Sequence, residues 1–368
     1  MIRFVLIFMF CLQAVVATGR EKADTLNAET SEISKTIDLD MIRRTIRGFD
    51  HMEDEYIEPQ HYEFTVMGQI TRTYESFNLG SNGQSIVLSP DGQTKIGPYF
   101  GWKWFFLGYT FAIDGLGFNS SGLRKEFDVS VYSSQIGADF YYRRTGHDYK
   151  IRDVKLGYGI DGNKFEGIPF SGVNVGITGL NAYYIFNHGR FSYPAAFGQS
   201  TCQKISCGSW MAGVGYTKNT LDLDYERLCR TLSTKMPVGE DAKLDSGLMF
   251  KSIKYNDFML SGGYAYNWVF FKDWLFCASG QVGLAYKTTY GEVADEEKGL
   301  DLKKMNMDMI GRFGLVYNNT RWYTGLSLIL RTNNYHTSRF TANNIFGSFN
   351  AYLGYNFKLK SKYKKNKG

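Results

Sequence analysis

The final segment of the chain, residues 349–359, constrains its fold most. Its odd positions are Phe, Ala, Leu, Tyr, Phe and Leu, and its even positions are Asn, Tyr, Gly, Asn and Lys. Successive side chains of a β-strand point to opposite faces, so this pattern predicts a strand with one apolar and one polar face. A tilted strand of about ten residues crosses a bilayer. The segment therefore predicts either the last strand of a membrane barrel or an edge strand of a soluble sheet.

The same segment also carries a sorting pattern. The spacing of Gly354, Phe357 and Leu359 resembles the C-terminal signal by which the outer-membrane assembly machinery recognises barrel precursors. A polar residue usually opens that signal, and Tyr352 stands in its place. The resemblance implies two partners: the barrel-assembly machinery during biogenesis, and outer-membrane lipid afterwards.

The composition favours strands over helices. Aromatic residues make up 16% of the 368 residues, and the chain has 40 glycines but only 6 prolines. The mean hydropathy of -0.29 is too low for a helical membrane protein. It agrees with a barrel, because lipid-facing and lumen-facing residues alternate along each strand.

The N-terminus predicts export. Arg3 precedes an apolar run over 4–16, and Ala17 follows with Val15 two residues before it. This arrangement is typical of a secretory signal peptide over 1–17. The alternative, a membrane anchor, would need a longer apolar run. The predicted location is the outer membrane of a Gram-negative-type bacterium.

Residues 18–61 are predicted to form an N-terminal periplasmic segment with one amphipathic helix near 36–57. Apolar residues such as Ile42, Ile46 and Phe49 recur there at helical spacing. The sequence leaves three positions open for this helix: beneath the barrel, inside it as a plug, or on the inner face of the membrane.

The formal net charge of +6 comes largely from the C-terminal end. Six lysines lie there, in and just before a basic tail over 360–368: Lys358, Lys360, Lys362, Lys364, Lys365 and Lys367. The rest of the chain is close to neutral and has no basic face for nucleic acid. We interpret the tail as a solvated end, with contact to anionic headgroups or a periplasmic partner as the alternative.

Alternation with period two continues from residue 62 to residue 359 and predicts an all-β, transmembrane antiparallel β-barrel of about twelve strands. The first strand should pair with the last to close the barrel. The expected strands lie near 62–79, 84–100, 103–113, 126–145, 148–160, 170–187, 204–219, 247–270, 274–290, 301–317, 321–332 and 343–359.

The connections give an independent test, because a barrel that begins and ends in the periplasm assigns each connection to a side. The inner side receives short turns at 101–102, 145–147, 271–273 and 318–320. The outer side receives mostly long, polar spans near 114–125, 160–170, 220–246, 291–302 and 333–342. Short inner turns and long outer loops are typical of outer-membrane barrels. The connection 188–203 is the exception, since it falls on the inner side yet is long.

A soluble β-sandwich is the alternative fold. Aromatic residues at the predicted inner turns favour the barrel, because such barrels carry aromatic belts at the membrane interfaces. The predicted membrane-interface aromatics are Trp268, Phe270, Trp274, Tyr317, Trp322, Tyr355 and Phe357.

Three segments carry a family resemblance: IGPYFGWKWFFLGYT at 96–110, FSYPAAF at 191–197 and GGYAYNW at 262–268. With the flanking helix and the last strand, the chain resembles the Bacteroidota family of outer-membrane barrels known as domain of unknown function 4421. The resemblance implies the location and the fold, and it brings no catalytic residues. The second segment lies in the long connection 188–203, which marks that connection as a candidate lumen-facing loop.

The polar face of the strands supplies candidate lumen-lining residues, namely Gln281, Lys287, Asp308, Arg312, Asn350 and Asn356. Charges of both signs on neighbouring strands are expected to pair across the interior. Because twelve strands lie between a filled and an open barrel, the interior is a narrow pore, a ligand cavity or a closed polar core. We expect a monomer that acts as a narrow pore or binding barrel for small polar or lipidic solutes. A docking barrel that works through its outer loops, chiefly 220–246, is an alternative.

The one pattern with catalytic chemistry is His336 with Ser338, which share a face if both lie on one strand. Outer-membrane phospholipases use this spacing with an Asn, for which Asn350 or Asn343 is available. This is the basis of an alternative lipid hydrolase, but the segment reads more readily as a polar loop, so we expect no catalytic residues. No nucleotide, cofactor or metal signature is present in the sequence, and none of those groups is expected.

Four cysteines follow the predicted signal peptide. Cys202 and Cys207 are close enough in sequence to form a small disulfide in an oxidising periplasm. Cys277 lies in a strand pattern and is expected to be a small apolar filler.

Overall fold

The computed structural model describes residues 52–102, 105–108, 111–113, 125–145, 148–157, 161–236, 242–290, 305–337 and 339–364. The predicted signal peptide, most of the predicted N-terminal helix and residues 365–368 of the tail lie outside the described residues. Within those ranges, no helix is both long enough and apolar enough to span a membrane.

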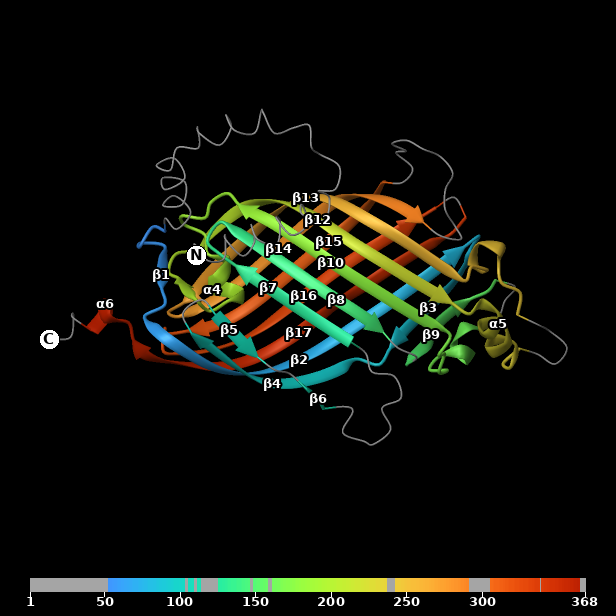
Figure 1. Ribbon diagram of the computed structural model, residues 1–368, viewed down its shortest axis with the longest axis horizontal. Helices are drawn as coiled ribbons and strands as arrows, with labels where there is room; N and C mark the ends of the chain where they lie inside the picture. The colour runs from blue at the N-terminus through green and yellow to red at the C-terminus, as the bar shows by residue number, and fades with distance from the viewer. Residues whose placement is uncertain are drawn as a thin grey trace, which may run out of the picture. The chain divides into compact units, whose positions relative to one another are not determined.

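The fold is an all-β antiparallel barrel made from one curled sheet (Figure 1). The described strands of this sheet are β2 (Tyr62–Ser81), β3 (Gln84–Pro90), β4 (Gln93–Trp102), β5 (Phe105–Gly108), β6 (Phe111–Ala112), β7 (Lys125–Tyr132), β8 (Ile136–Thr145), β9 (Tyr149–Lys155), β10 (Val173–Ile185), β12 (Cys207–Leu223), β13 (Ser252–Phe271), β14 (Trp274–Tyr290), β15 (Met305–Asn318), β16 (Trp322–His336) and β17 (Thr341–Leu359).

The strand order is β5-β4-β2-β17-β16-β15-β14-β13-β12-β10-β8-β7, with β6 also on β4. The last strand pairs with the first, with Leu359 opposite Tyr62 and Thr341 opposite Gly80, as the sequence predicts. Near the two ends of this order, a side-chain contact joins β4 to β7, because Lys95 forms an ion pair of 2.7 Å with Glu126.

The barrel has two distinct ends. We call one the turn end, because it carries the tight connections 272–273 and 319–321; the backbone N–H of Asn318 donates to the carbonyl of Asp273 there. The other, the cap end, carries the β3–β9 pair, the 3-10 helices η1 (Gly162–Phe165) and η2 (Ser246–Leu248), and α5 (Tyr225–Ser233). A second sheet pairs β1 (Ile57–Pro59) with β11 (Thr201–Gln203), next to α4 (Tyr193–Phe197) in sequence. The chain ends with α6 (Ser361–Lys364).

Three sequence-based boundaries are wrong. The segment 126–145 is a hairpin of β7 and β8, because a turn forms where Ser133 donates its backbone N–H to the carbonyl of Ile136, with no Gly or Pro to signal it. The segment 84–100 is two strands, β3 and β4, and 148–160 contains β9, which pairs with β3 at the cap end instead of crossing. The hairpin adds one strand that runs between the two ends of the barrel, and the segment 148–160 removes one. Among the described residues, the number of such segments therefore stays at twelve.

The same hairpin changes one side assignment. The end of β8 at Thr145 lies at the cap end and not with the inner turns, because Thr145 pairs with Val175 at the start of β10. The turn at 133–135 takes its place at the turn end.

The end of the predicted N-terminal helix is also wrong. Residues 54–56 form a turn and β1 follows directly. Tertiary contacts override the helical pattern here, because β1 pairs with β11 and Glu53 forms an exposed ion pair with Arg190.

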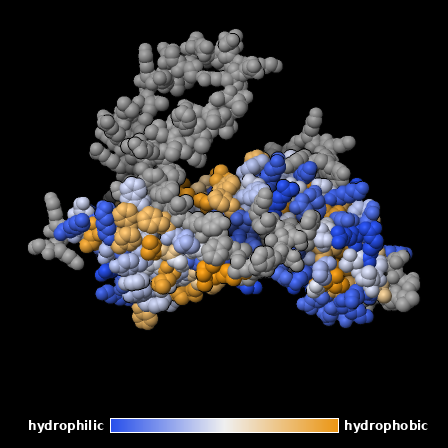
Figure 2. All heavy atoms as spheres, turned by 60° about the horizontal axis from the view of Figure 1, so that its bottom comes forward, coloured by the Kyte–Doolittle hydropathy of each residue, from blue (hydrophilic) through white to orange (hydrophobic). Residues whose placement is uncertain are grey.

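The outward face of the barrel is apolar. Leu260, Trp210 and Val214 are 69%, 67% and 62% exposed, far above what a soluble core residue shows. Figure 2 shows hydrophobic residues over the left and centre of the molecule, while the right-hand part, where β3, β9 and α5 lie, is mainly hydrophilic. On the face shown, exposed apolar residues therefore gather over the strands and are sparse at the cap end.

The inward face packs tyrosine rings over glycines of the neighbouring strand. A Cβ at Gly179 of β10 would overlap the ring of Tyr141 on β8. Tyr141 is buried and its hydroxyl is hydrogen-bonded to Thr217 at 2.9 Å, so the ring has little room to move.

Gly179→Ala is therefore expected to lower the free energy of unfolding by about 1–3 kcal/mol through overpacking. Gly280→Ala is the matched control, because Gly280 faces outward and nothing lies within 4 Å of its added Cβ. Urea unfolding in detergent micelles measures both variants. Equal midpoints for the two variants would contradict the packing described.

Candidate functional site

The candidate site is the interior of the barrel. Five of the six predicted lumen-lining residues are buried: Gln281, Lys287, Asp308, Arg312 and Asn356. The sixth, Asn350, is half-buried, accepts hydrogen bonds from Gln69 and Thr71 and donates one to Ser327.

One charge cluster surrounds Lys287 of β14. Its Nζ lies 2.6 Å from Asp257 of β13 and 3.1 Å from Asp308 of β15. It also donates to the Oδ1 of Asn333 on β16 at 2.6 Å, and Asn333 donates in turn to Asn219 of β12 at 2.9 Å. One lysine thus pairs with two buried carboxylates and links side chains from five neighbouring strands.

A second cluster joins opposite walls. The guanidinium of Arg312 on β15 forms a short ion pair with Asp139 of β8, although four strands lie between β15 and β8 in the sheet. Arg331 of β16 approaches the same carboxylate at 3.8 Å, and Ser130 donates to it at 2.6 Å. The arginine and aspartate side chains are 0% and 1% exposed, so the interior is bridged from wall to wall by a buried pair.

The long connection between β10 and β12 fills the turn end of the interior. Tyr193, Pro194, Ala195 and Ala196 of α4 are buried, and α4 packs on β7, β14 and β15. The hydroxyl of Tyr193 donates to Ser279 at 2.8 Å and accepts from Arg312 at 3.4 Å. We call residues 186–206 the plug. The sequence predicted that this connection lies on the inner side as a lumen-facing loop. The strand alternation did not reveal that it contains the buried helix α4.

Polar contacts fix the plug to the wall. Gln199 donates to the hydroxyl of Tyr352 on β17 at 2.8 Å and accepts from Asn318 of β15 at 3.1 Å. Asn267 of β13 donates to the carbonyl of Ser192 at 2.8 Å. The plug is therefore held from several strands by hydrogen bonds that do not depend on the N-terminal segment.

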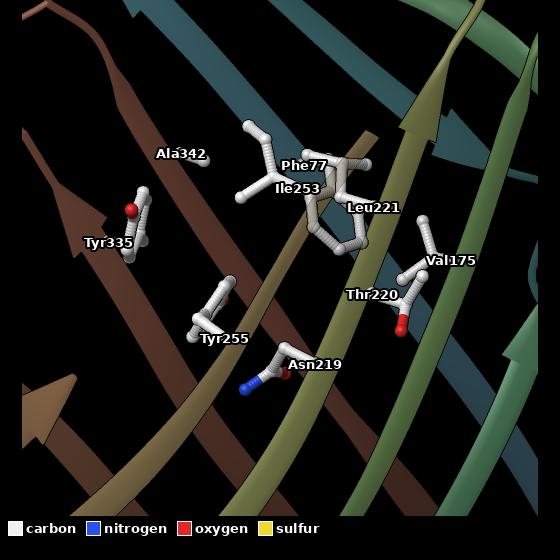
Figure 3. Close-up of a pocket in the computed structure, with 9 residues that line it drawn as sticks. All are labelled: Phe77, Val175, Asn219, Thr220, Leu221, Ile253, Tyr255, Tyr335 and Ala342. Atoms are coloured by element: carbon white, nitrogen blue, oxygen red, sulfur yellow. The ribbon is translucent and has the colours of Figure 1, made fainter. Parts of the chain in front are cut away.

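The cap end is closed by an apolar cluster. Leu228 and Leu232 of α5 and Phe165 of η1 are fully buried against residues that include Leu79 and Ile253 of the strands. Below it, a cavity of about 10 Å3 lies among β2, β10, β12, β13, β16 and β17, lined by Phe77, Tyr255 and Tyr335 among others (Figure 3). A second cavity, of about 20 Å3, touches Tyr141, Asp308 and Arg331. Each has room for about one water molecule, so neither is an aqueous path.

The predicted interface aromatics form two groups of neighbouring rings at the turn end. Trp274 and Tyr317 have centroids 5.4 Å apart, and Trp322 and Tyr355 have centroids 4.5 Å apart. Further neighbours at 5.5–6.3 Å are Trp268–Phe270, Phe270–Trp274 and Tyr355–Phe357.

The structure separates His336 from Asn350, one of the two asparagines proposed for catalysis, and leaves Asn343 two residues from the partner of His336. His336 is exposed at the end of β16 and pairs with Thr341, whereas Asn350 pairs with Ser327, nine residues further along β17. Asn343 pairs with Asn334. Ser338 lies outside the described residues. Within the described part of the chain, no three His, Cys, Asp or Glu side chains are grouped to hold a metal ion.

The possible disulfide between Cys202 and Cys207 is not formed in the structure, where both cysteines are free. Cys202 of β11 points to the carbonyl of Asn318 at 3.7 Å, while Cys207 of β12 accepts from Asn187 at 3.2 Å. Cys202 lies in the plug, whereas Cys207 begins β12, and the two thiols have different hydrogen-bond partners. Burial raises the pKa of the Cys202 thiol to about 12, so it stays protonated. Cys277 is buried, as expected of a filler.

Sequence reasoning missed the residues of β8. Asp139 and Arg143 are each 1% exposed and carry the cross-barrel contacts, including the approach of Arg143 to the carbonyl of Gly347 on β17 at 3.5 Å. The signal was available, since 137–145 alternates inward Gly, Asp, Tyr, Arg and Thr with outward Ala, Phe, Tyr and Arg. Treating 126–145 as one strand obscured it.

Lys287→Met is expected to lower the free energy of unfolding by about 3–5 kcal/mol, because it leaves two buried carboxylates without a cation. The matched variant is the triple change Lys287→Met, Asp257→Asn and Asp308→Asn, which removes the charges together and should recover most of the loss. Denaturant midpoints in micelles compare the two. If the single and triple variants were equally unstable, the charges would not be coupled as the geometry requires.

Comparison with known proteins assigns this chain to a family, but it does not assign an activity. The family model described as "Domain of unknown function (DUF4421)" matches residues 51–357. No curated protein matches the chain.

Among solved structures, the chain is similar to the outer membrane protease OmpT from Escherichia coli, at 8% identity and a TM-score of 0.32, over 83% of this chain and 100% of that one. It is also similar to the translocator domain of autotransporter NalP from Neisseria meningitidis, at 10% identity and a TM-score of 0.30, over 91% of this chain and 100% of that one. Similarity at this level does not bear on what the chain does. The family match spans nearly the whole described barrel, and the chain belongs to the family of domain of unknown function 4421.

Proposed function

We propose that this chain is a monomeric outer-membrane β-barrel that is closed at rest and acts as a binding or docking barrel. The observation that carries the proposal is the closed interior. The Arg312–Asp139 pair bridges it, the plug fills one end and the apolar cluster under α5 fills the other.

The membrane location is supported by the outward face. Exposed leucines, valines and aromatic residues cover the strands, and two groups of aromatic rings mark the turn end. In this orientation the turn end faces the periplasm, with the predicted signal peptide directing export, and the cap end faces outward.

The pore version of the function has less support than the binding version. A steady aqueous path needs connected space, and the two cavities described hold about 10 and 20 Å3. The hydrolase alternative has the least support, because His336 is exposed at the end of β16 and, of the two asparagines proposed for it, only Asn343 lies near it.

Leu260→Arg tests the membrane location. Leu260 is 69% exposed at mid-strand on β13, so the change would be nearly neutral in water but should cost about 2–4 kcal/mol in a bilayer. Met249→Arg is the control, because Met249 is 47% exposed but lies at the cap end outside the strands. Urea unfolding from liposomes gives both values. A Leu260→Arg variant as stable as the control would argue against a lipid-facing surface.

Planar-bilayer recording tests the closed state. The purified full chain, checked as folded by its heat-dependent gel mobility, should give no steady single-channel current. A steady ohmic current from the wild-type protein would contradict a closed interior and favour the narrow pore.

A further inference from the structure

Three cations point outward beyond the apolar belt on one wall of the barrel. Arg144 of β8, Lys218 of β12 and Lys254 of β13 are all exposed. The strand register aligns Arg144 with Gly176, Thr220 and Lys254, and Lys218 lies two residues from Thr220. We call these three side chains the cationic row.

Strand β10, which lies between β8 and β12, carries short side chains on its outward face here. On β10, the outward positions facing Arg144 and Lys218 are Gly176 and Thr178. Since neighbouring strands lie about 4.8 Å apart, Arg144 and the β12 residues flank a shallow trough about 10 Å wide. Long cationic side chains on both sides of a short floor can reach a group seated between them.

The belt directly below the row is apolar. Phe140, Leu180, Tyr216 and Phe258 face each other in one register line across β8, β10, β12 and β13 and are 40%, 47%, 40% and 57% exposed. This pairs positive charge with an apolar surface on adjacent rows, which is the complement of a charged headgroup above its acyl chains.

Within the part of the chain that the structure describes, no carboxylate forms an ion pair with the cationic row, and the nearest outward one in the strand register, Asp222, lies two residues from Thr220 on β12. Among the described residues, the ion pairs of this wall lie inside, as in Arg143–Asp128 and Lys287–Asp257. The outward Asp222 accepts instead from Asn174 and Ser252. The outward row formed by β2, β17 and β16 on another part of the barrel is the neutral series Asn78, Asn343 and Asn334.

We propose that the cationic row binds the phosphate groups of a lipid in the surrounding leaflet, whose acyl chains lie on the apolar belt. The inference rests on the proposed function, because it needs the outward face to be in a membrane. Arg144 supplies a planar fork that suits phosphate, and the two lysines supply point charges.

Native mass spectrometry of the full chain in a non-ionic detergent tests the proposal, with bis-phosphorylated lipid A and its dephosphorylated form as probes. The variant Arg144→Gln, Lys218→Gln, Lys254→Gln should bind lipid A about 100-fold more weakly, at roughly fivefold for each cation. The matched control is Arg227→Gln, Arg230→Gln, Lys235→Gln, three exposed cations in and just after α5, which should bind like the wild type.

Two results would overturn the proposal: equal binding by the cationic-row variant and the wild type, or equal binding of the phosphorylated and dephosphorylated lipids. Folding into liposomes, read from heat-dependent gel mobility, distinguishes failure of the proposed function from failure of the lipid site. A wild-type chain that does not insert refutes the proposed function, whereas a chain that inserts without phosphate preference refutes only the lipid site.

Discussion

The buried ion pair between Arg312 and Asp139 is the contact on which the rest of the interior depends. A guanidinium and a carboxylate without water must be paired, because an isolated buried charge costs several kcal/mol. The partners come from β15 and β8, so the pair is satisfied only when the sheet curls enough to bring these strands together. Closure of the barrel and pairing of these two buried charges are therefore coupled.

The plug is coupled to the same pair. Tyr193 contacts Arg312 through its hydroxyl, and the Arg312 guanidinium lies over the rings of Tyr183 and Tyr193. Cation–π contacts of this kind gain strength where water is excluded. The long connection between β10 and β12 thus has a physical role, since Tyr193 supplies a ring and a hydroxyl group to the buried Arg312. The outer wall carries a separate chemistry, with lipid-compatible side chains and a cationic row that the interior does not use.

Much of the fold could be predicted from the sequence because a strand's two faces face different solvents. From residue 252 onward, alternation located β13 to β17 closely, and the pairing of β17 with β2 followed from closure. The polar face of the same strands identified Lys287, Asp308 and Arg312. The expected pairing of opposite charges on neighbouring strands holds for Lys287 and Asp308. The partner of Arg312 could not be predicted, because Asp139 lies far away in sequence and in a hairpin whose turn, 133–135, has no glycine or proline. The plug was equally hidden, since α4 has only five residues and its burial depends on a cavity that other strands create.

The measurement that tests this account most directly is a double-mutant cycle between Arg312→Met and Asp139→Asn, with unfolding free energies measured in micelles. The structure predicts a coupling energy of about 2–3 kcal/mol, because each single change strands a buried group that the double change removes. Additive effects, with a coupling energy near zero, would mean that the two walls are not joined and that the interior is not closed as described.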